Sequence, residues 1–336
     1  SAWGYVPPFV PARTVCYNLR LDQPLRFHPR TTEVLRMSWG FQLLNKPYGS
    51  VTEGPVWDGE NLLFTHISAN RIYRCDHKTN EITVWREGTN RTNGLAHDEK
   101  GQLFGCCSGG RAILRFDPDG NNVVIADGFD GHQLNTPNDL AVDRQGRVWF
   151  TNPWNATNID ATEIEEPGLR AVLCATPQAD GSYSVARVET DSTMPNGILV
   201  SIDGKTLYVA ESNSDDVSID RELRAYPIKD DGSLGPYETL HAFGTNKREA
   251  QRGIDGMCLD REGNIVATAG WPSSGPGPLI YVFDPKGRVI ETHPVPCIRP
   301  TNCAFGGPDR STLYVTSAEG HLFKAETDME GWALFP

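Results

Sequence analysis

The sequence lacks long apolar runs, paired cysteine motifs and any excess of basic residues. No stretch approaches the ~20 apolar residues that a membrane-spanning helix needs, so no membrane partner is expected. Acidic residues number 43 against 31 basic ones, and the formal net charge is −12. A basic surface is required to bind a phosphate backbone, so a nucleic-acid partner is not expected either. The acidic surplus favours cation binding, although a solvated acidic surface is the commoner explanation.

None of the eight cysteines belongs to a C-x-x-C pair, which argues against a zinc knuckle or a thioredoxin-type motif. Their spacing is not the dense framework of a small disulfide-rich domain, so buried free thiols are expected. A cytoplasmic location follows as the expectation. A periplasmic or secreted location would apply if a leader had been removed before Ser1. A monomer or a small homo-oligomer is expected.

Glycine (33) and proline (24) are frequent, which indicates many turns and few long helices. An internal repeat organises these turns. Each of six copies has a polar anchor residue, an apolar segment, an Asp-Gly-type turn and an alternating strand. The six anchors, separated by 40, 45, 58, 59 and 47 residues, are Glu53, Asn93, Asn138, Asn196, Asp255 and Asn302. Four short strands per repeat at this period predict an all-β, six-bladed β-propeller.

The sixth copy has little room for a fourth strand. An N-terminal strand within residues 32–46 is therefore expected to pair with the strand at 321–326 and close the last blade, since closure removes open strand edges. Residues 31–336 are interpreted as a single propeller domain. Residues 1–30 are interpreted as an irregular N-terminal extension. The length of 336 residues fits one domain because propellers exceed the usual single-domain size.

Aligned anchors in a propeller surround one axis, so six oxygen-bearing side chains are expected at one mouth of the central channel. Two carboxylates and four amides form a set of hard oxygen donors. Glu53 and Asp255 would repel one another there without a cation. The pattern predicts one divalent cation, foremost Ca²⁺, with Mg²⁺, Mn²⁺ and Zn²⁺ as alternatives. A hydrogen-bonded polar plug is the competing interpretation.

The second strand of each blade returns towards the anchors, so its last residues are expected to line a pocket. These residues are His66, Cys107, Asn152, Glu211 and Ser317. Trp154 and Trp271 follow shortly after and are expected to form walls for a small ring. Asn93, Asn138, Asn152 and Glu211 are the further candidate substrate contacts. His66 is a candidate proton shuttle, although a lone histidine is more often structural, and Cys107 is interpreted as packing.

Five ordered motifs give the chain a specific resemblance. They are Glu53-Gly-Pro-Val-Trp, Leu134-Asn-Thr-Pro-Asn-Asp, Met194-Pro-Asn-Gly, Ile254-Asp-Gly-Met-Cys and Thr301-Asn-Cys-Ala-Phe-Gly-Gly. From about residue 50 to 325 the chain resembles the gluconolactonase/regucalcin (senescence marker protein) family, which itself implies a six-bladed propeller.

The resemblance implies that Glu53, Asn196 and Asp255 are metal ligands. It makes Asn138 a fourth ligand or a substrate contact, and Asp255 the candidate general base. The chain departs from the family pattern around His66, at Thr136 and at Asn152, so the resemblance does not carry a sugar-lactone specificity over to this chain.

The function expected from these features is metal-dependent hydrolysis of small lactones. A metal-bound carbonyl oxygen is stabilised as it becomes negative, and a nearby carboxylate can activate water. The same oxygen cage would serve a phosphotriesterase or an arylesterase, which only a substrate panel can separate from a lactonase. A non-enzymatic binding propeller is the third hypothesis, and it would not need the axial carboxylates.

Overall fold

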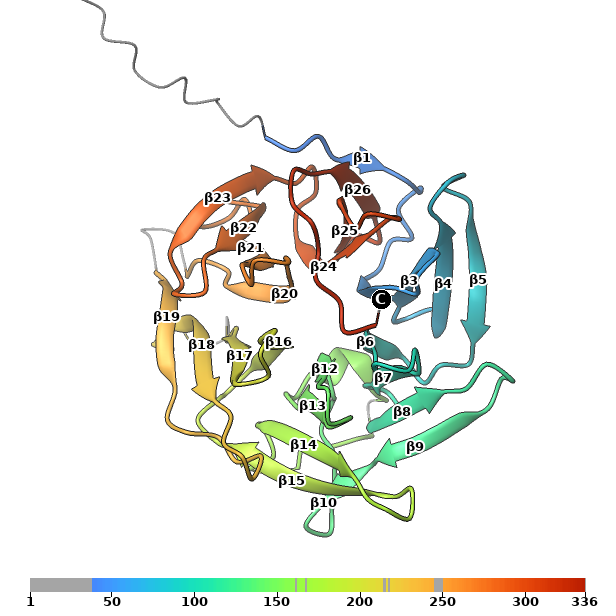
Figure 1. Ribbon diagram of the computed structural model, residues 1–336, viewed down its shortest axis with the longest axis vertical. Coiled ribbons are helices and arrows are strands. Elements are labelled where there is room, and N and C mark those ends of the chain that lie inside the picture. Colours follow the sequence, from blue (N-terminus) through green and yellow to red (C-terminus); the bar gives the residue numbers. More distant parts are fainter. Residues whose placement is uncertain are drawn as a thin grey trace, which may run out of the picture. The chain divides into compact units, whose positions relative to one another are not determined.

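The computed structural model describes residues 38–335, except 161, 167, 214, 215, 217 and 245–249. These residues form six four-stranded antiparallel sheets that follow one another around a ring (Figure 1). The predicted six-bladed propeller is thus confirmed. The predicted extension 1–30 and the first part of the predicted closing strand, 32–37, lie outside the described residues. Within the described part, no helix is long and apolar enough to cross a membrane.

Each of the first three blades is an up-and-down sheet in chain order. Blade 1 contains β2 (Thr52–Trp57), β3 (Asn61–His66), β4 (Arg71–Asp76) and β5 (Ile82–Glu87). Blade 2 contains β6 (Thr92–His97), β7 (Leu103–Cys107), β8 (Ala112–Phe116) and β9 (Asn122–Ala126). Blade 3 contains β12 (Leu140–Val142), β13 (Val148–Thr151), β14 (Val172–Pro177) and β15 (Tyr183–Glu189). The hairpin β10 (Gly128–Phe129) and β11 (His132–Gln133) precedes blade 3, and the 3₁₀ helix η1 (Ala156–Asn158) lies within it.

The remaining blades repeat this order, and the last one is completed by the earliest described strand. Blade 4 contains β16 (Pro195–Val200), β17 (Thr206–Glu211), β18 (Arg221–Pro227) and β19 (Glu238–Phe243). Blade 5 contains β20 (Ile254–Leu259), β21 (Ile265–Ala269), β22 (Leu279–Phe283) and β23 (Val289–Pro294). Blade 6 contains β24 (Pro300–Gly306), β25 (Thr312–Ser317), β26 (Leu322–Glu326) and β1 (Gln42–Leu43).

The predicted ring closure is present. Gln42 of β1 pairs with Lys324 and Leu43 pairs with Phe323, so β1 covers the outer edge of β26. The residues just before β1 also contact blade 5. Trp39 is 8% exposed, and its ring stacks on His293 at a centroid distance of 3.7 Å. The Trp39 backbone amide donates to Nδ1 of His293 at 3.2 Å. This segment therefore joins the last two blades.

We expect Trp39→Ala to lower the free energy of unfolding by about 3–5 kcal/mol, because it empties a buried aromatic site between blades. Leu43→Ala is the matched control in the same segment. The Leu43 side chain is 46% exposed, so its loss should cost less than about 1 kcal/mol. Urea unfolding of both variants measures the difference. Equal small effects would show that the segment contributes nothing to closure.

Irregular pairing marks the innermost strands at their anchors. In blades 1, 2, 4, 5 and 6 the register between the first and second strand shifts at the anchor or directly after it. Two residues there lie opposite one residue of the partner strand. This irregularity is a β-bulge, and it changes the direction in which the side chains point. A Cβ on Gly197, directly after the anchor Asn196, would lie 2.5 Å from the backbone oxygen of Asp255. Glycine at this position therefore lets neighbouring anchors approach the axis.

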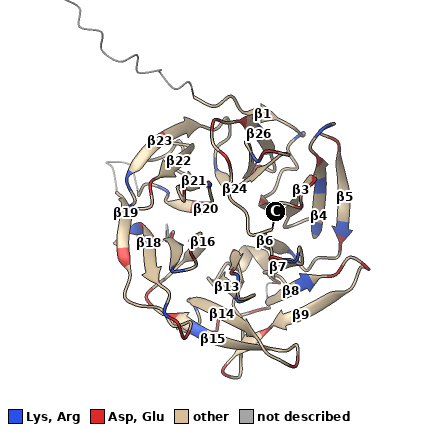
Figure 2. Cartoon of the chain, in the orientation of Figure 1, with Lys and Arg blue, Asp and Glu red and all other residues tan. Residues whose placement is uncertain are grey.

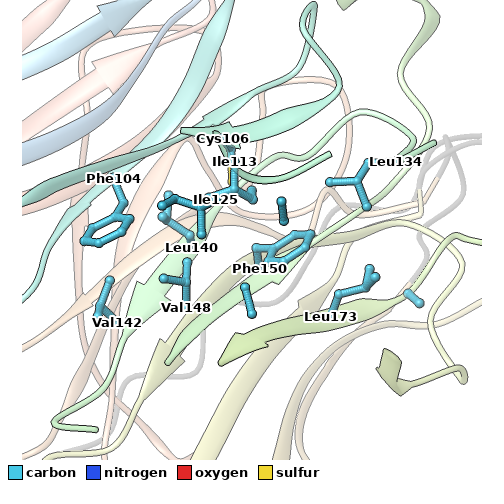
Figure 3. Close-up of a cluster of buried hydrophobic side chains, with 13 residues drawn as sticks. Phe104, Cys106, Ile113, Ile125, Leu134, Leu140, Val142, Val148, Phe150 and Leu173 are labelled. Atoms are coloured by element: carbon cyan, nitrogen blue, oxygen red, sulfur yellow. The ribbon is translucent and has the colours of Figure 1, made fainter. Parts of the chain in front are cut away.

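Apolar side chains fill the spaces between neighbouring blades. Figure 3 shows one such cluster between blades 2 and 3, where Phe104 and Ile113 face Leu140, Val148 and Phe150. Val148 and Phe150 are fully buried. Alternation along each strand directs one set of residues to each face of the sheet, so every blade contributes to two such clusters. The clusters hold the first strands, and hence the anchors, in position.

The central channel has a second, more apolar opening, whose cavity reaches the anchor Asn302. A cavity of about 170 Å³ is lined there by inner-strand residues such as Leu199, Met257 and Phe305, and by residues 332–335. The Trp332 amide donates to the Leu259 carbonyl at 2.9 Å, and the rings of Phe335 and His97 lie 5.4 Å apart. This segment occupies the apolar opening, which leaves the anchor side as the polar mouth of the channel.

Candidate active site at the polar mouth of the channel

A cavity of about 460 Å³ lies at the polar mouth and brings five of the predicted site residues together. Its lining consists of Asn138, Pro153, Trp154, Asn155, Ala156, Arg170, Met194, Pro195, Asn196, Ser212, Arg252, Gly253, Ile254, Asp255, Trp271 and Arg299. The anchors of blades 3, 4 and 5 thus share one wall, and the predicted Trp154 and Trp271 also line it. A larger hollow of about 660 Å³ is formed by turns of blades 1 and 2 and contains no anchor. The cavity at the polar mouth is therefore the candidate site.

Glu53 lies deeper, below the cavity wall, and is only 4% exposed. Burial raises the pKa of its carboxyl well above the usual range, and the nearby charges of Asp255 and Asp139 raise it further. The amide of Gly54 donates to Oε2 of Glu53 at 2.8 Å, and Asn302 also hydrogen-bonds the carboxyl. The predicted proximity of Glu53 and Asp255 is thus present in the structure, and each of the two carboxylates opposes ionisation of the other.

Asp255 lies in the wall of the cavity, with its side chain 15% exposed. Its carboxylate accepts a hydrogen bond from the Arg252 guanidinium and another from Asn196. Burial raises the pKa of Asp255, while Arg252, Asn196 and Arg299 oppose that rise. A carboxylate has about four lone-pair positions, so these two partners leave acceptor capacity for a water molecule or a cation.

A second layer beneath the anchors was not predicted from the sequence. Asp139 is 7% exposed, and burial raises the pKa of its carboxyl to about 7. The side-chain amide of Asn302 donates to Oδ2 of Asp139 at 3.3 Å. One sequence signal could have revealed Asp139. The residue after the anchor is glycine in blades 1, 2, 4 and 5, whereas blade 3 has an aspartate there.

The predicted rim residues lie deeper than expected. His66, Cys107, Asn152, Glu211 and Ser317 are all buried, and none of them lines the cavity. The following residues take their place, since Pro153 and Trp154 come directly after Asn152, and Ser212 after Glu211. In blades 3 and 4 the second strand ends below the mouth, and the loop after it reaches the cavity.

Glu211 supports the loop that precedes an anchor. Its two carboxylate oxygens accept hydrogen bonds from the backbone amides of Thr193 and Met194 and from the Thr193 hydroxyl, at 2.8–3.0 Å. Asn152 similarly donates to the Leu169 carbonyl at 2.7 Å. These contacts position the loops beside the cavity, which corrects the expectation that both side chains line it.

His66 lies inside blade 1, away from the cavity lining. Its ring stacks on Tyr48 at 5.1 Å, and its Nε2 is 3.4 Å from the Ser68 hydroxyl. Burial lowers the pKa of His66, and the charge of Arg71 lowers it further. His66 does not line the cavity that contains Asp255, and the proposed role of His66 as a proton shuttle stays a prediction.

The described cysteines are free, as expected. Cys107 is fully buried, and burial raises the pKa of its thiol to about 12. A thiol with a raised pKa is a poor nucleophile at neutral pH. Cys107 thus fits its predicted role in packing.

The side chains at the site decide which kind of cation it could hold. Among the described residues no three His, Cys, Asp or Glu side chains gather as a metal cluster, so any ion here must use amide oxygens as well. Glu53, Asp255, Asn138 and Asn196 offer two carboxylates and two amides near one another. The anchor Asn93 is buried, and its Oδ1 has no hydrogen-bond partner among the described residues. An oxygen set with an unpartnered acceptor and two repelling carboxylates fits a Ca²⁺-type ion.

Comparisons with known proteins agree with this architecture. Residues 51–319 match the family model described as SMP-30/Gluconolactonase/LRE-like region. A gluconolactonase from Zymomonas mobilis is 29% identical over 91% of this chain and 86% of its own length. Regucalcin from Xenopus laevis is 28% identical over 80% of this chain and 83% of its own length.

The chain is also similar in fold to a solved structure of a gluconolactonase. A gluconolactonase from Xanthomonas campestris has a TM-score of 0.71 and 26% identity, covering 86% of this chain and 89% of that chain. The family match extends over most of the six blades and includes all six anchors that the sequence repeat had singled out. The chain therefore belongs to the SMP-30/gluconolactonase/LRE-like family.

Proposed function

We propose that this protein is a metal-dependent lactonase that opens small cyclic esters at the polar mouth of the channel. The observation that carries the proposal is the placement of Asn138, Asn196 and Asp255 in one cavity wall, with Asp255 close enough to the buried carboxyl of Glu53 for its charge to raise the pKa of that carboxyl. Relatives named gluconolactonase support the reaction class. The cavity volume of about 460 Å³ is within the range of small-molecule sites.

Glu53, Asn196 and Asp255 would hold the cation, and Asn138 would be a fourth ligand or a contact to the substrate. A bound divalent cation, with Ca²⁺ as the best fit, would polarise the lactone carbonyl and stabilise negative charge on its oxygen. Trp154 and Trp271 would enclose the ring from the sides, since both line the cavity. Asn93, although it lies outside the lining, would complete the axial oxygen set.

Asp255 would act as the general base. Its position in the wall allows it to accept a proton from a water molecule that attacks the lactone carbonyl. A pKa raised by burial makes a carboxylate a stronger base than an exposed aspartate. The bond between the carbonyl carbon and the ring oxygen would then break, and the ring oxygen would leave as the alcohol of the opened hydroxy acid by taking up the proton that Asp255 had accepted from water.

A substrate panel tests the proposal. Purified protein supplied with Ca²⁺ is expected to hydrolyse five- and six-membered lactones faster than p-nitrophenyl acetate or paraoxon, measured by proton release in weakly buffered solution. Turnover of paraoxon without lactone turnover would instead favour a phosphotriesterase. Turnover of none of these compounds, with metal bound, would favour a binding propeller.

A further inference from the structure

The candidate cavity has a charge opposite to that of the whole chain. The charged residues in its lining are three arginines, Arg170, Arg252 and Arg299, and one acid, Asp255. The chain as a whole has a net charge of −12. Figure 2 shows basic and acidic residues interspersed around the outer strands. The excess of positive charge at the cavity is therefore a local feature of the wall.

Two of the three arginines are already engaged within the protein. Arg170 pairs with both carboxylate oxygens of Glu165, at 2.6 and 3.0 Å. Arg252 pairs with Asp255 and donates to the Pro300 carbonyl at 2.9 Å. These contacts neutralise much of their charge and fix their positions. Both arginines thus support the wall of the cavity.

Arg299 differs from Arg170 and Arg252 in its exposure and in its hydrogen-bond partners. It is exposed and directly precedes β24 at the rim of the cavity. Its guanidinium makes no hydrogen bond or ion pair with the described residues, although its charge lowers the pKa of Asp255. A guanidinium presents five N–H donors in a planar fork that matches carboxylate, sulfonate or phosphate oxygens. Arg299 is therefore available to an anion on a ligand.

We infer that the substrate is a lactone that carries a second, anionic group, and that Arg299 at the rim binds this group. The inference rests on the proposed lactonase function and adds a substrate class to it. A neutral lactone would leave the Arg299 donors to water. An anionic substituent on the ring would reach the rim while the ester group lies deeper, near Asp255. Arg299 thus becomes a determinant of specificity and takes no part in bond breaking.

Steady-state kinetics with matched lactones test this inference. D-glucono-1,5-lactone is the neutral substrate, 6-phospho-D-glucono-1,5-lactone presents a phosphate, and D-glucaro-1,4-lactone presents a carboxylate. We expect kcat/KM to be about tenfold or more higher for at least one anionic lactone, as a charge-assisted hydrogen bond is worth about that factor. Whichever anionic lactone is preferred identifies the anion that the rim accepts. Added salt should raise KM for the anionic substrate and leave KM for the neutral one unchanged, because exposed charges are screened.

Arg299→Gln should abolish the preference by lowering the ratio of anionic to neutral kcat/KM about tenfold or more, chiefly through a higher KM for the anionic lactone. Arg299→Lys should retain part of the preference. Arg288→Gln is the control for charge alone, since Arg288 is 77% exposed and lies outside the cavity lining. An unchanged ratio of anionic to neutral kcat/KM in Arg299→Gln overturns the inference. If the wild-type protein hydrolysed no lactone at all, the proposed function itself would be overturned.

Discussion

Replacement of Asp255 by Asn is expected to lower kcat for lactone hydrolysis by about 10²–10⁴-fold, the usual effect of losing a general base. The amide keeps the shape and one ligand oxygen, but it cannot take a proton from water. The fold should survive, because Asp255 lies in the cavity wall and its side chain is not part of an apolar cluster. Measurement of kcat and metal content on the same sample separates loss of the base from loss of the ion.

His66→Ala is the control for the alternative base. His66 is packed on Tyr48 and does not line the cavity, so its removal should change kcat by less than about threefold. If the Asp255→Asn variant hydrolysed lactones at the wild-type rate with metal bound, Asp255 would be a metal ligand and not the base. A large loss in His66→Ala with an unchanged melting temperature would instead assign the proton transfer to His66.

Removal of the metal by a chelator is expected to abolish lactone turnover, and Ca²⁺ is expected to restore it. The same ion should stabilise the fold, by about 2.7 kcal/mol at a concentration of one hundred times its Kd. Glu53→Gln should weaken both effects, since it removes one of the two carboxylates in the proposed cage. Repletion with Mg²⁺, Mn²⁺ or Zn²⁺ in place of Ca²⁺ identifies the most effective ion. Full activity in protein shown to be metal-free would contradict the proposal.

The stabilisation by metal should also depend on pH. Burial raises the pKa of Asp139 to about 7 from an ordinary value of about 4, and it raises the pKa of Glu53 and Asp255 as well. Between these values the folded, metal-free protein binds more protons than the unfolded chain, so its stability falls as pH rises from about 4 to about 7. A cation favours the ionised carboxylates. The increase in melting temperature on adding Ca²⁺ should therefore be larger at pH 8 than at pH 5, and a constant increase would argue against a carboxylate cage.

The sequence repeat was sufficient to predict the propeller, because each copy carries its own strand alternation and turn residues. Local patterns of this kind do not depend on distant contacts. The same repeat predicted the closing strand, since blade 6 lacked one and β1 supplies it. It also aligned the anchors, and the structure places Asn138, Asn196 and Asp255 in one wall because the first strands surround a common axis.

The depth of each side chain was decided by the tertiary structure. Alternation shows which face of a strand a residue occupies, but loop length determines how far the chain continues before it reaches the mouth. Asn152 and Glu211 are therefore buried supports, and Trp154 and Ser212 line the cavity. Asp139 of blade 3 joined the axial set through a contact across the channel, where it accepts a hydrogen bond from Asn302 of blade 6.

The charge of the cavity could not be predicted from the sequence alone either. Arg170, Arg252 and Arg299 come from three different connections and share no motif, so their convergence depends on how blades 3 to 6 are arranged around the axis. The sequence by itself determined the fold and the oxygen donors, because both recur with the repeat. Only the tertiary structure brought three arginines to one cavity, because residues outside the repeat are placed by the packing of whole blades.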